Sequence, residues 1–504
     1  MTSISAMTSG TMGQNCVPNA DIMPALKNTR TRVLVALASY GTKNQTYLEQ
    51  VIREYCSMPY EVHVVVLSNI PKDLGPDIEV RVGLPHKNPW SLPFGHKQLF
   101  AERMEQYDVF IYAEDDILIS QQNIDAFVLA SGTLPADVIP GFVHAETDNG
   151  GNLFFDPVHS HFHWDPASVA SAGDYTFAFY TNEHSACFLL TREQLKRAIQ
   201  SGGFLVPAHE GRYDMLCTAA TDPYTQCGFK KMVCISHLED FTVRHLPNNK
   251  HAVRPYRARA VFYRQIEALL NLGKRGHPRG LLFAPETKVL NAKWSKDYYE
   301  PVREDVISLV PENAKSVLSI GCGWGATERR LVARGARVVG LPMDSVIAAC
   351  AEEGGVAMVY GDLATSRREL EKQRFDCIVF INTLHLLPDP VSMLSWFTEL
   401  LTRDGVVVIA TPNFANAVTY WRRLTRDRHY KDLGSYASSG LHLTSPGVLT
   451  QWFNQCGLEP VASRHIPFER AQHIQSILPE RFAKALSSEL VVSARRTCAI
   501  ATAK

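Results

Sequence analysis

The sequence predicts an α/β protein of two domains, and two observations support this prediction. The chain has 504 residues, which is more than one ordinary hydrophobic core accommodates. Short apolar runs alternate with helical patterns in two separate series, an order typical of parallel sheets covered by helices. The predicted organisation is a flexible tail at 1–28, a first domain at 29–253, a connector at 254–291 and a second domain at 292–504.

The first series begins with RVLVALAS, which reads as a buried strand because it is short, apolar and followed by a polar turn. The next segment has helical spacing, with Leu48, Val51 and Ile52 on one face. A strand, a helix and a second strand at this spacing predict a parallel pair with a right-handed crossover. The expected elements are strands at 32–39, 61–69 and 108–113 and helices at 44–58 and 97–107, followed by an irregular segment rich in aromatic residues and histidine at 140–250.

The second series has the same alternation and begins after a connector that contains a Tyr/Arg-rich helix. Its apolar runs again have the length of buried strands, and the segments between them have helical spacing. The expected elements are strands at 316–321, 336–341, 375–382 and 405–413 and helices at 326–335 and 345–354.

The composition excludes several classes of protein. The 51 basic and 51 acidic residues cancel, which argues against a general nucleic-acid binder. The eleven cysteines are scattered without a C-x-x-C pair, which favours a reducing, cytoplasmic compartment. No apolar run is long enough for a transmembrane segment, and the N-terminus has neither a basic leader nor an apolar signal core.

Three adjacent carboxylates, Glu114, Asp115 and Asp116, follow the third buried strand of the first series. In open α/β sheets, ligands bind outside the carboxyl ends of the strands. Adjacent acids at such an end are costly unless a positive charge neutralises them, and Mg²⁺ or Mn²⁺ with oxygen ligands does so well. The alternative is that the acids merely open a surface loop.

The position of this triplet resembles the acidic D-x-D signature of glycosyltransferases of the GT-A fold, over about residues 30–250. The segments HSACFLLTREQLKRAIQSGGF (184–204) and HEGRYDML (209–216) resemble the acceptor half of such enzymes. The resemblance implies a GT-A-like domain, a nucleotide-sugar donor, a glycan or glycolipid acceptor, and a divalent metal that bridges the pyrophosphate.

The resemblance also suggests roles for three further residues. Glu210 and Asp214 are the acids nearest to the position of the catalytic base in inverting members, although either could instead offset a helix dipole. His245 is a candidate for an additional metal ligand taken from late in the domain, and the alternative is an ordinary surface or core histidine.

A glycine-rich turn, SIGCGWGA, connects the first strand and helix of the second series. Gly321, Gly323 and Gly325 let the backbone approach a ligand and direct helix N-terminal amides at it. Such a turn alone is weak evidence of a ligand site, because tight strand-to-helix turns need glycine for steric reasons.

Four later segments strengthen the interpretation of this turn. With it, they resemble class I S-adenosylmethionine-dependent methyltransferases over about residues 292–504, which implies a Rossmann-like fold and S-adenosylmethionine as cofactor. The segments are YGDL (360–363), FDCIVFINTLHLLPDP (375–390), LLTRDGVVVIATPN (400–413) and HLTSPGVLTQWFNQCGLEPV (442–461).

The resemblance assigns residues but also shows departures. Asp362 matches the residue that commonly contacts the adenine amine. Ser319 and Pro342 stand where the family usually has acids, and Asp344 either reaches back to the ribose or caps the next helix. His385 is the candidate base for a hydroxyl acceptor, and the alternative is that it packs beneath the loop.

The resulting hypothesis is a bifunctional cytoplasmic enzyme of surface polysaccharide or glycoconjugate biosynthesis. Its first domain transfers a sugar with a divalent metal, and its second domain methylates a hydroxyl. Two alternatives stay open: a glycosyltransferase with an inactive methyltransferase-like interaction domain, and a methyltransferase with an N-terminal glycan-binding module.

Overall fold

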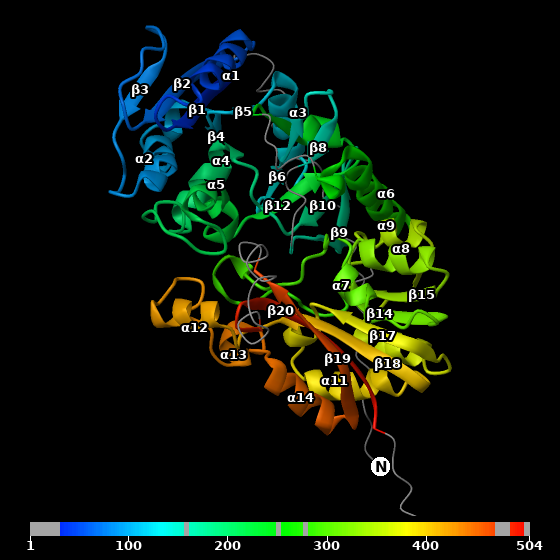
Figure 1. Cartoon of the computed structure of the whole chain (residues 1–504). Coiled ribbons are helices and arrows are strands. Elements are labelled where there is room, and N and C mark those ends of the chain that lie inside the picture. The colour runs from blue at the N-terminus through cyan, green and yellow to red at the C-terminus, as the bar shows by residue number, and fades with distance from the viewer. Residues whose placement is uncertain (1–30, 156–160, 248–253, 276–280, 469–483, 498–504) are drawn as a thin grey trace, which may run out of the picture.

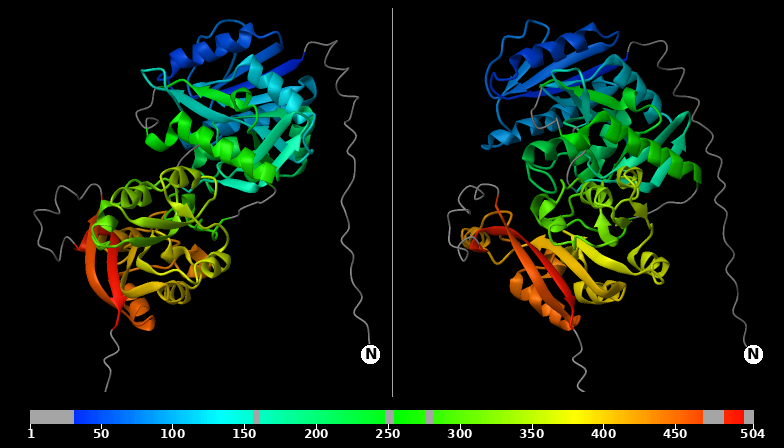
Figure 2. Two further views of the ribbon diagram at one scale, coloured as in Figure 1. Left: turned by 90° about the vertical axis from the view of Figure 1, so that its right-hand side faces the viewer. Right: turned by 45° about the vertical axis from the view of Figure 1, so that its right-hand side comes forward.

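The computed structural model describes residues 31–155, 161–247, 254–275, 281–468 and 484–497, which form two α/β halves in contact (Figure 1 and Figure 2). Within these residues the strands form four sheets. The predicted flexible tail at 1–28 lies outside them. Among the described helices, none combines the length and the apolar character that crossing a bilayer requires.

The first sheet contains the three strands of the first predicted series together with two strands that were not predicted. Its elements are β1 (Arg32–Ser39), α1 (Gln45–Ser57), β2 (Glu61–Ser68), β3 (Glu79–Val82), α2 (Gly95–Glu102), β4 (Val109–Glu114), β11 (Cys187–Thr191) and α4 (Arg192–Gln200). The predicted strands are β1, β2 and β4, and the strands that were not predicted are β3 and β11. The sheet order is β11-β4-β1-β2-β3. β1 pairs in parallel with β2 and with β4, so the carboxyl ends of these three strands meet at one edge.

The segment expected to be irregular, 140–250, instead contains strands of two further sheets, which corrects the prediction. Their orders are β6-β12-β10-β9 and β5-β13-β7-β8. Many of these strands are short and pair with strands distant in sequence, so no long alternating pattern marks them. The elements are β5 (Ile117–Leu118), α3 (Gln121–Ser131), β6 (Val138–Gly141), β7 (Val143–Thr147), β8 (Leu153–Phe155), β9 (Trp164–Ala172), β10 (Tyr175–Tyr180), α5 (Met215–Thr225), β12 (Lys230–Cys234) and β13 (Thr242–His245).

The C-terminal half has the doubly wound sheet that the second series predicts. The predicted helix at 345–354 is shorter than expected, because residues 343–348 form a turn. The elements of the C-terminal half are α7 (Glu304–Ile307), β14 (Ser316–Cys322), α8 (Ala326–Ala333), β15 (Arg337–Pro342), α9 (Ala349–Glu353), β16 (Ala357–Met358), α10 (Leu363–Glu369), β17 (Phe375–Ile381), α11 (Pro390–Thr398), β18 (Leu401–Pro412), α12 (Ala417–Leu424), α13 (Tyr436–Ser439), α14 (Pro446–Gln455), β19 (Leu458–Pro467) and β20 (Ser487–Arg496). α6 (Arg259–Arg275) belongs to the predicted connector and contacts β8 and β9 of the first half as well as α9.

The strand order of this sheet is β16-β15-β14-β17-β18-β20-β19. β14 occupies a central position and pairs in parallel with β15 and β17. β20 runs antiparallel to both of its neighbours, β18 and β19. The carboxyl end of β14, where a ligand of such a sheet binds, therefore lies beside the ends of β15 and β17.

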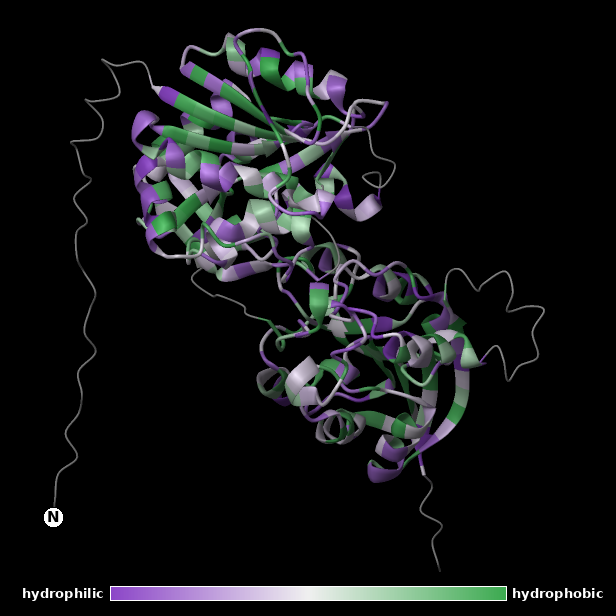
Figure 3. Ribbon diagram, turned by 90° about the vertical axis from the view of Figure 1, so that its left-hand side faces the viewer, coloured by the Kyte–Doolittle hydropathy of each residue, from purple (hydrophilic) through white to green (hydrophobic). Residues whose placement is uncertain are grey.

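One hydrophobic cluster runs through both halves of the molecule. Trp164 and Tyr180 from β9 and β10 belong to the same buried cluster as Leu341 and Met343 at the end of β15. Figure 3 shows hydrophobic residues concentrated along the strands of both halves and hydrophilic ones on the outer helices. The contact between the halves is therefore a packed apolar core, and burial of apolar area stabilises it.

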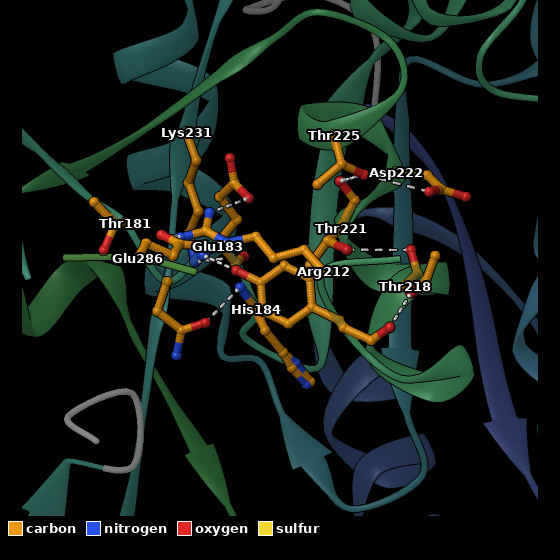
Figure 4. A network of polar contacts seen from close by, with 12 residues as sticks. Thr181, Glu183, His184, Arg212, Thr218, Thr221, Asp222, Thr225, Lys231 and Glu286 are labelled. Atoms are coloured by element: carbon orange, nitrogen blue, oxygen red, sulfur yellow. Dashed lines mark hydrogen bonds and ion pairs between the residues drawn. The ribbon is translucent and has the colours of Figure 1, made fainter. Parts of the chain in front are cut away.

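A polar clamp ties the connector to the first half (Figure 4). Arg212 Nε and Nη2 donate to the two carboxylate oxygens of Glu286, each over 3.0 Å. Arg212 Nη1 also contacts Glu183 over 3.4 Å, and Lys231 Nζ donates to the Glu183 carbonyl over 3.0 Å. A bidentate arginine–carboxylate pair fixes orientation as well as distance, so it aligns the connector on the first half.

The fold buries neutral histidine, which makes its stability depend on pH. His96 of α2 is packed among aromatic rings, and burial lowers its pKa to about 3. Its unfolded pKa is about 6.5, so below that pH the unfolded chain binds the extra proton first. We expect the free energy of unfolding to fall by up to ~1.4 kcal/mol per pH unit from this site as pH drops from about 6.5.

Urea unfolding at a series of pH values measures this effect. His96→Phe removes the titrating ring but keeps an aromatic side chain. The plot of unfolding free energy against pH below about 6.5 should therefore become less steep, by up to the slope that one proton contributes. Exposed His86→Gln is the matched control. An identical slope in the wild-type protein and His96→Phe would contradict the assignment.

Candidate functional site

The acidic triplet lies where the sequence predicted it, at the carboxyl edge of the first sheet. Glu114 ends β4, and Asp115 and Asp116 form the turn into β5. Asn44, just before α1, donates from Nδ2 to Asp115 Oδ1 over 2.8 Å and to Asp116 Oδ2 over 3.0 Å. The acids are thus not splayed into solvent, which excludes the interpretation as an open surface loop: Asp115 and Asp116 are both buried.

The protonation of the triplet reflects this crowding. Burial and the neighbouring Asp116 charge raise the pKa of Glu114 to about 8. Burial raises the pKa of Asp115 to about 6, against the hydrogen bonds from Ser39 and Asn44. Carboxyl groups with raised pKa values are common at functional sites, because their charged forms are stabilised only when a cation or another positive group binds.

His245 supplies part of that positive charge. Its Nε2 lies 3.6 Å from Asp116 Oδ2, and its Nδ1 lies 2.6 Å from Glu146 Oε1. Burial opposes the charged ring, but the hydrogen bonds to Asp116 and Glu146 outweigh it and raise the pKa of His245 to about 10. The structure therefore brings His245 to the triplet as predicted, and it adds Glu146 of β7, which sequence reasoning missed.

The donor chemistry of this cluster fits a hard cation, but its present geometry is incomplete. Asp116 Oδ1 and Glu146 Oε2 are buried and have no hydrogen-bond partner among the described residues. Carboxylate oxygens are the ligands that Mg²⁺ and Mn²⁺ prefer. However, within the described residues no three His, Cys, Asp or Glu side chains converge as a ready metal site. Binding a cation requires these side chains to turn.

A cavity of about 320 Å³ opens onto the triplet. Trp90 and Pro93 line one part of it, Tyr40 and Asn44 another, and Leu216 of α5 a third. Aromatic walls around a few converging polar groups are typical of small-molecule sites. The triplet thus has an adjacent space that a ligand can occupy.

The two candidate bases have different surroundings. Glu210 Oε2 accepts from Arg428 Nη1 over 2.6 Å, so this acid ties the first half to the second. Asp214 is the N-cap of α5, where its Oδ1 accepts from the Cys217 N–H over 3.0 Å. Asp214 also lies near enough to the triplet that its charge contributes to the raised pKa of Glu114, behind burial and Asp116. Of the two, Asp214 belongs to the cluster.

The glycine turn lies at the carboxyl end of β14, as predicted. The group that its glycines approach closely is another segment of this chain. Gly321 and Gly325 have φ of 77° and 81°, a conformation that glycine adopts without strain. A Cβ on Gly323 would lie 2.1 Å from the carbonyl oxygen of Tyr298, which accepts from the Trp324 N–H over 2.9 Å. The segment before β14 therefore lies directly on the loop.

Four charged side chains surround this loop, and sequence reasoning missed all of them. Lys296 Nζ donates to Glu300 Oε2 and to the Ile381 carbonyl, each over 2.7 Å. Ser319 Oγ donates to Glu328 Oε1 over 2.6 Å, so α8 supplies an acid beside the strand position that lacks one. Asp297 completes the set around a cavity of about 10 Å³.

These groups fit the charges of the amino-acid end of S-adenosylmethionine, but the space does not fit the molecule. One ammonium and three carboxyl groups complement a zwitterion. A cavity of that volume holds about one water molecule. With Tyr298 seated on the loop, the cleft is closed to a cofactor, and the segment 294–300 has to move before one can enter.

The residues predicted for the nucleoside part are separated from one another. Asp344 is buried, and its Oδ1 accepts from the N–H groups of Val346 and Ile347, so it stabilises the turn before α9, whose N-cap is Ala348. Its Oδ2 lies 3.7 Å from Nδ1 of His163, a residue of the first half. Asp362 is exposed and caps α10 by accepting from the Thr365 N–H over 2.7 Å. The first half therefore covers part of the region expected to hold a ribose.

His385 lies beneath the loop at the end of β17. Its Nε2 contacts the Trp294 carbonyl over 3.1 Å, and the ring is buried. Burial lowers its pKa to about 4, so it is neutral at physiological pH, as a general base has to be. Its present contacts match the alternative that His385 packs beneath the loop, since Trp294 covers it.

Comparison with known proteins identifies the C-terminal half. Residues 294–463 match a family model described as a methyltransferase domain. Residues of this chain are 31% identical over 124 positions to the ubiquinone biosynthesis O-methyltransferase of Actinobacillus pleuropneumoniae serotype 5b, covering 22% of this chain and 53% of that protein. The enzyme of the same name from Pseudomonas aeruginosa UCBPP-PA14 is 29% identical over 154 residues, covering 29% of this chain and 65% of that one.

The chain thus spans about half to two thirds of the curated relatives it matches. Among solved structures, a SAM dependent methyltransferase from Archaeoglobus fulgidus aligns with 38% of this chain and 90% of its own, at 16% identity and a TM-score of 0.30. Residues 294–463 of the C-terminal half thus match a methyltransferase domain, and this half has a Rossmann-like, mainly parallel sheet. The family match lies wholly within that half.

Proposed function

We propose that this chain is a two-site transferase. Its first half moves a sugar from a nucleotide-sugar donor to a glycan or glycolipid, and its second half methylates a hydroxyl of the same class of acceptor. The observation that carries the first part is the buried acid cluster beside a cavity of about 320 Å³ at the carboxyl edge of a parallel sheet. The match to a methyltransferase domain supports the second part.

In the first half, Asp115 and Asp116 with Glu114 are the residues that would hold Mg²⁺ or Mn²⁺. Bound there, the cation would neutralise the diphosphate of the donor and of the leaving nucleotide. Asn44 orients both aspartates, and Asp214, the N-cap of α5, is our candidate to accept a proton from an acceptor hydroxyl. Trp90 offers an aromatic ring to a sugar or base at the cavity wall.

In the second half, the relatives named O-methyltransferases support a hydroxyl acceptor. Neutral His385 is the residue suited to take that proton once Trp294 moves aside. Two sites in one chain raise the effective concentration of a product that both use.

The closed glycine loop favours a second candidate, in which the methyltransferase domain serves as an interaction module for the first half. Its cleft is filled by Tyr298 and its nucleoside side is covered by His163. A methyltransferase with an N-terminal glycan-binding module is the remaining alternative, and nucleotide-sugar turnover by the first half separates it from the other two.

Calorimetric titration of the full chain with S-adenosylmethionine separates the two leading candidates. We expect saturable binding with a dissociation constant at or below the millimolar range, weakened by Lys296→Met because Lys296 is the cation beside the loop. Exposed Lys288→Met, whose Nζ donates to the Ala437 carbonyl, controls for the loss of one positive charge, and the melting temperature of Lys296→Met shows whether the fold is kept. Absence of binding at millimolar cofactor would leave the interaction module as the function of this domain.

A further inference from the structure

α12 carries an apolar surface that the proposed reactions do not use. Tyr420, Trp421 and Leu424 are 72%, 59% and 71% exposed. They lie at positions i, i+1 and i+4 of one short helix and so share one side of it. We call these three residues the α12 patch. Other exposed large hydrophobic residues of the described chain, such as Leu129 and Val461, lie on separate elements.

The segment that follows the patch is basic. Between residues 422 and 432 stand four arginines and one lysine against two aspartates. Arg422 pairs with Asp427, and Arg428 pairs with Glu210. Arg423, Arg426 and Lys431 are exposed and have no carboxylate within ion-pair distance among the described residues. Their charge is therefore available to an external anion.

A groove runs along the same helix. Phe414, Ala417 and Leu424 line it together with Arg423, and its volume is about 670 Å³. Its wall is partly apolar, with Asn416, Thr419 and Arg423 as polar members, so it can receive an apolar group that ends in a negative charge. The patch and the groove, which share Tyr420 and Leu424, thus combine apolar surface with exposed cations, although Arg423 Nη2 also donates to the Leu433 carbonyl over 3.1 Å.

We propose that the α12 patch binds the surface of an anionic phospholipid bilayer. Tryptophan and tyrosine prefer the boundary between lipid tails and headgroups, and neighbouring arginine and lysine attract anionic headgroups. The area argues against a second protein: three side chains of up to roughly 200 Å² each fall short of the ~800 Å² per partner of a standard protein interface. A bilayer requires no matching shape.

α12 lies close to the candidate methylation site at His385. Phe414 at its base packs edge-on against Trp294, with ring centroids 5.2 Å apart. Trp294 in turn contacts His385 through its carbonyl. A lipid surface held at α12 therefore lies next to the candidate methylation site, which suits an acceptor that is itself anchored in the membrane. This consequence rests on the proposed function, whereas the membrane binding does not.

Sedimentation of the full chain with vesicles tests the proposal. We expect binding to vesicles of phosphatidylcholine with about 30 mol% phosphatidylglycerol, and binding at least about tenfold weaker to phosphatidylcholine alone. The variant Tyr420→Gln/Trp421→Gln/Leu424→Gln should lose binding to both. The variant Arg423→Gln/Arg426→Gln should lose only the preference for anionic vesicles.

The matched control is Leu129→Gln/Val461→Gln, which removes comparably exposed apolar side chains elsewhere and should bind as the wild-type protein does. Because the patch is exposed, all variants should keep the wild-type melting temperature. Equal vesicle binding by the wild-type protein and the patch variant, or no binding by the wild-type protein, would overturn the proposal. A dimer in sedimentation velocity that the patch variant abolishes would overturn it in favour of a second copy. None of these outcomes depends on sugar or methyl transfer.

Discussion

Asp116→Asn is expected to lower Mn²⁺-dependent turnover of the nucleotide sugar by about 10²–10³-fold. The substitution keeps the shape of the side chain and its hydrogen bond with Asn44, but it removes the charge next to the unpartnered, buried Oδ1. A site that has to hold a divalent cation and a diphosphate together depends on that charge. Release of nucleoside diphosphate from a panel of nucleotide sugars, with and without Mn²⁺, measures the effect.

The control for this experiment is Asp125→Asn on α3. Asp125 is exposed and accepts a hydrogen bond from the Tyr60 hydroxyl, outside the cavity at the triplet. It should leave turnover unchanged. If Asp116→Asn also left turnover unchanged, the triplet would be a structural cluster neutralised by His245, and the proposal of sugar transfer would lose its main support.

Lys97→Met is expected to destabilise the fold by about 3–5 kcal/mol. Lys97 of α2 and Asp222 of α5 form an ion pair in which both side chains are almost wholly buried. Removing the lysine leaves the Asp222 carboxylate in the core with the Thr225 hydroxyl and His209, each at 3.4 Å, as its side-chain partners among the described residues. An unpaired buried charge costs far more than the pair contributes.

The double variant Lys97→Met/Asp222→Leu distinguishes that cost from simple loss of packing. Burial lowers the pKa of Lys97 and raises that of Asp222, so desolvation already opposes both charges. Replacing both with apolar residues should recover most of the lost stability. Urea unfolding followed by tryptophan fluorescence measures all variants, with exposed Arg259→Gln, which breaks a surface pair with Glu239, as the control. A double variant as unstable as the single one would contradict this explanation.

Local patterns predicted the parts of the fold that depend on local sequence. The segments that form β1, β2, β4 and β14 are apolar and bounded by turn residues, so the sequence predicted both that they are strands and where they lie. The triplet was found for the same reason, because three acids directly after a buried run stand out. The strands between Val138 and His245 were missed, and pairing between segments distant in sequence explains part of this: β6 pairs with β12 and β7 with β13, whereas β9 and β10 are neighbours along the chain.

The site residues that sequence reasoning missed are those brought in by tertiary contacts. Glu146 reaches the triplet through the pairing of β7 with β13, and Glu328 reaches Ser319 through the turn of α8. A weak signal existed for Glu328: the acid absent from the strand reappears nine residues later on the helix that follows the glycines. Nothing in the local sequence signalled that His163 would lie beside Asp344.

The apolar cluster shared by Trp164, Tyr180, Leu341 and Met343 also determines how this protein can be handled. Cutting the chain near residue 285 would expose apolar surface on each fragment to solvent. Each fragment would then tend to aggregate, which would prevent a separate activity assay. Heating the intact chain should therefore unfold both halves in one transition.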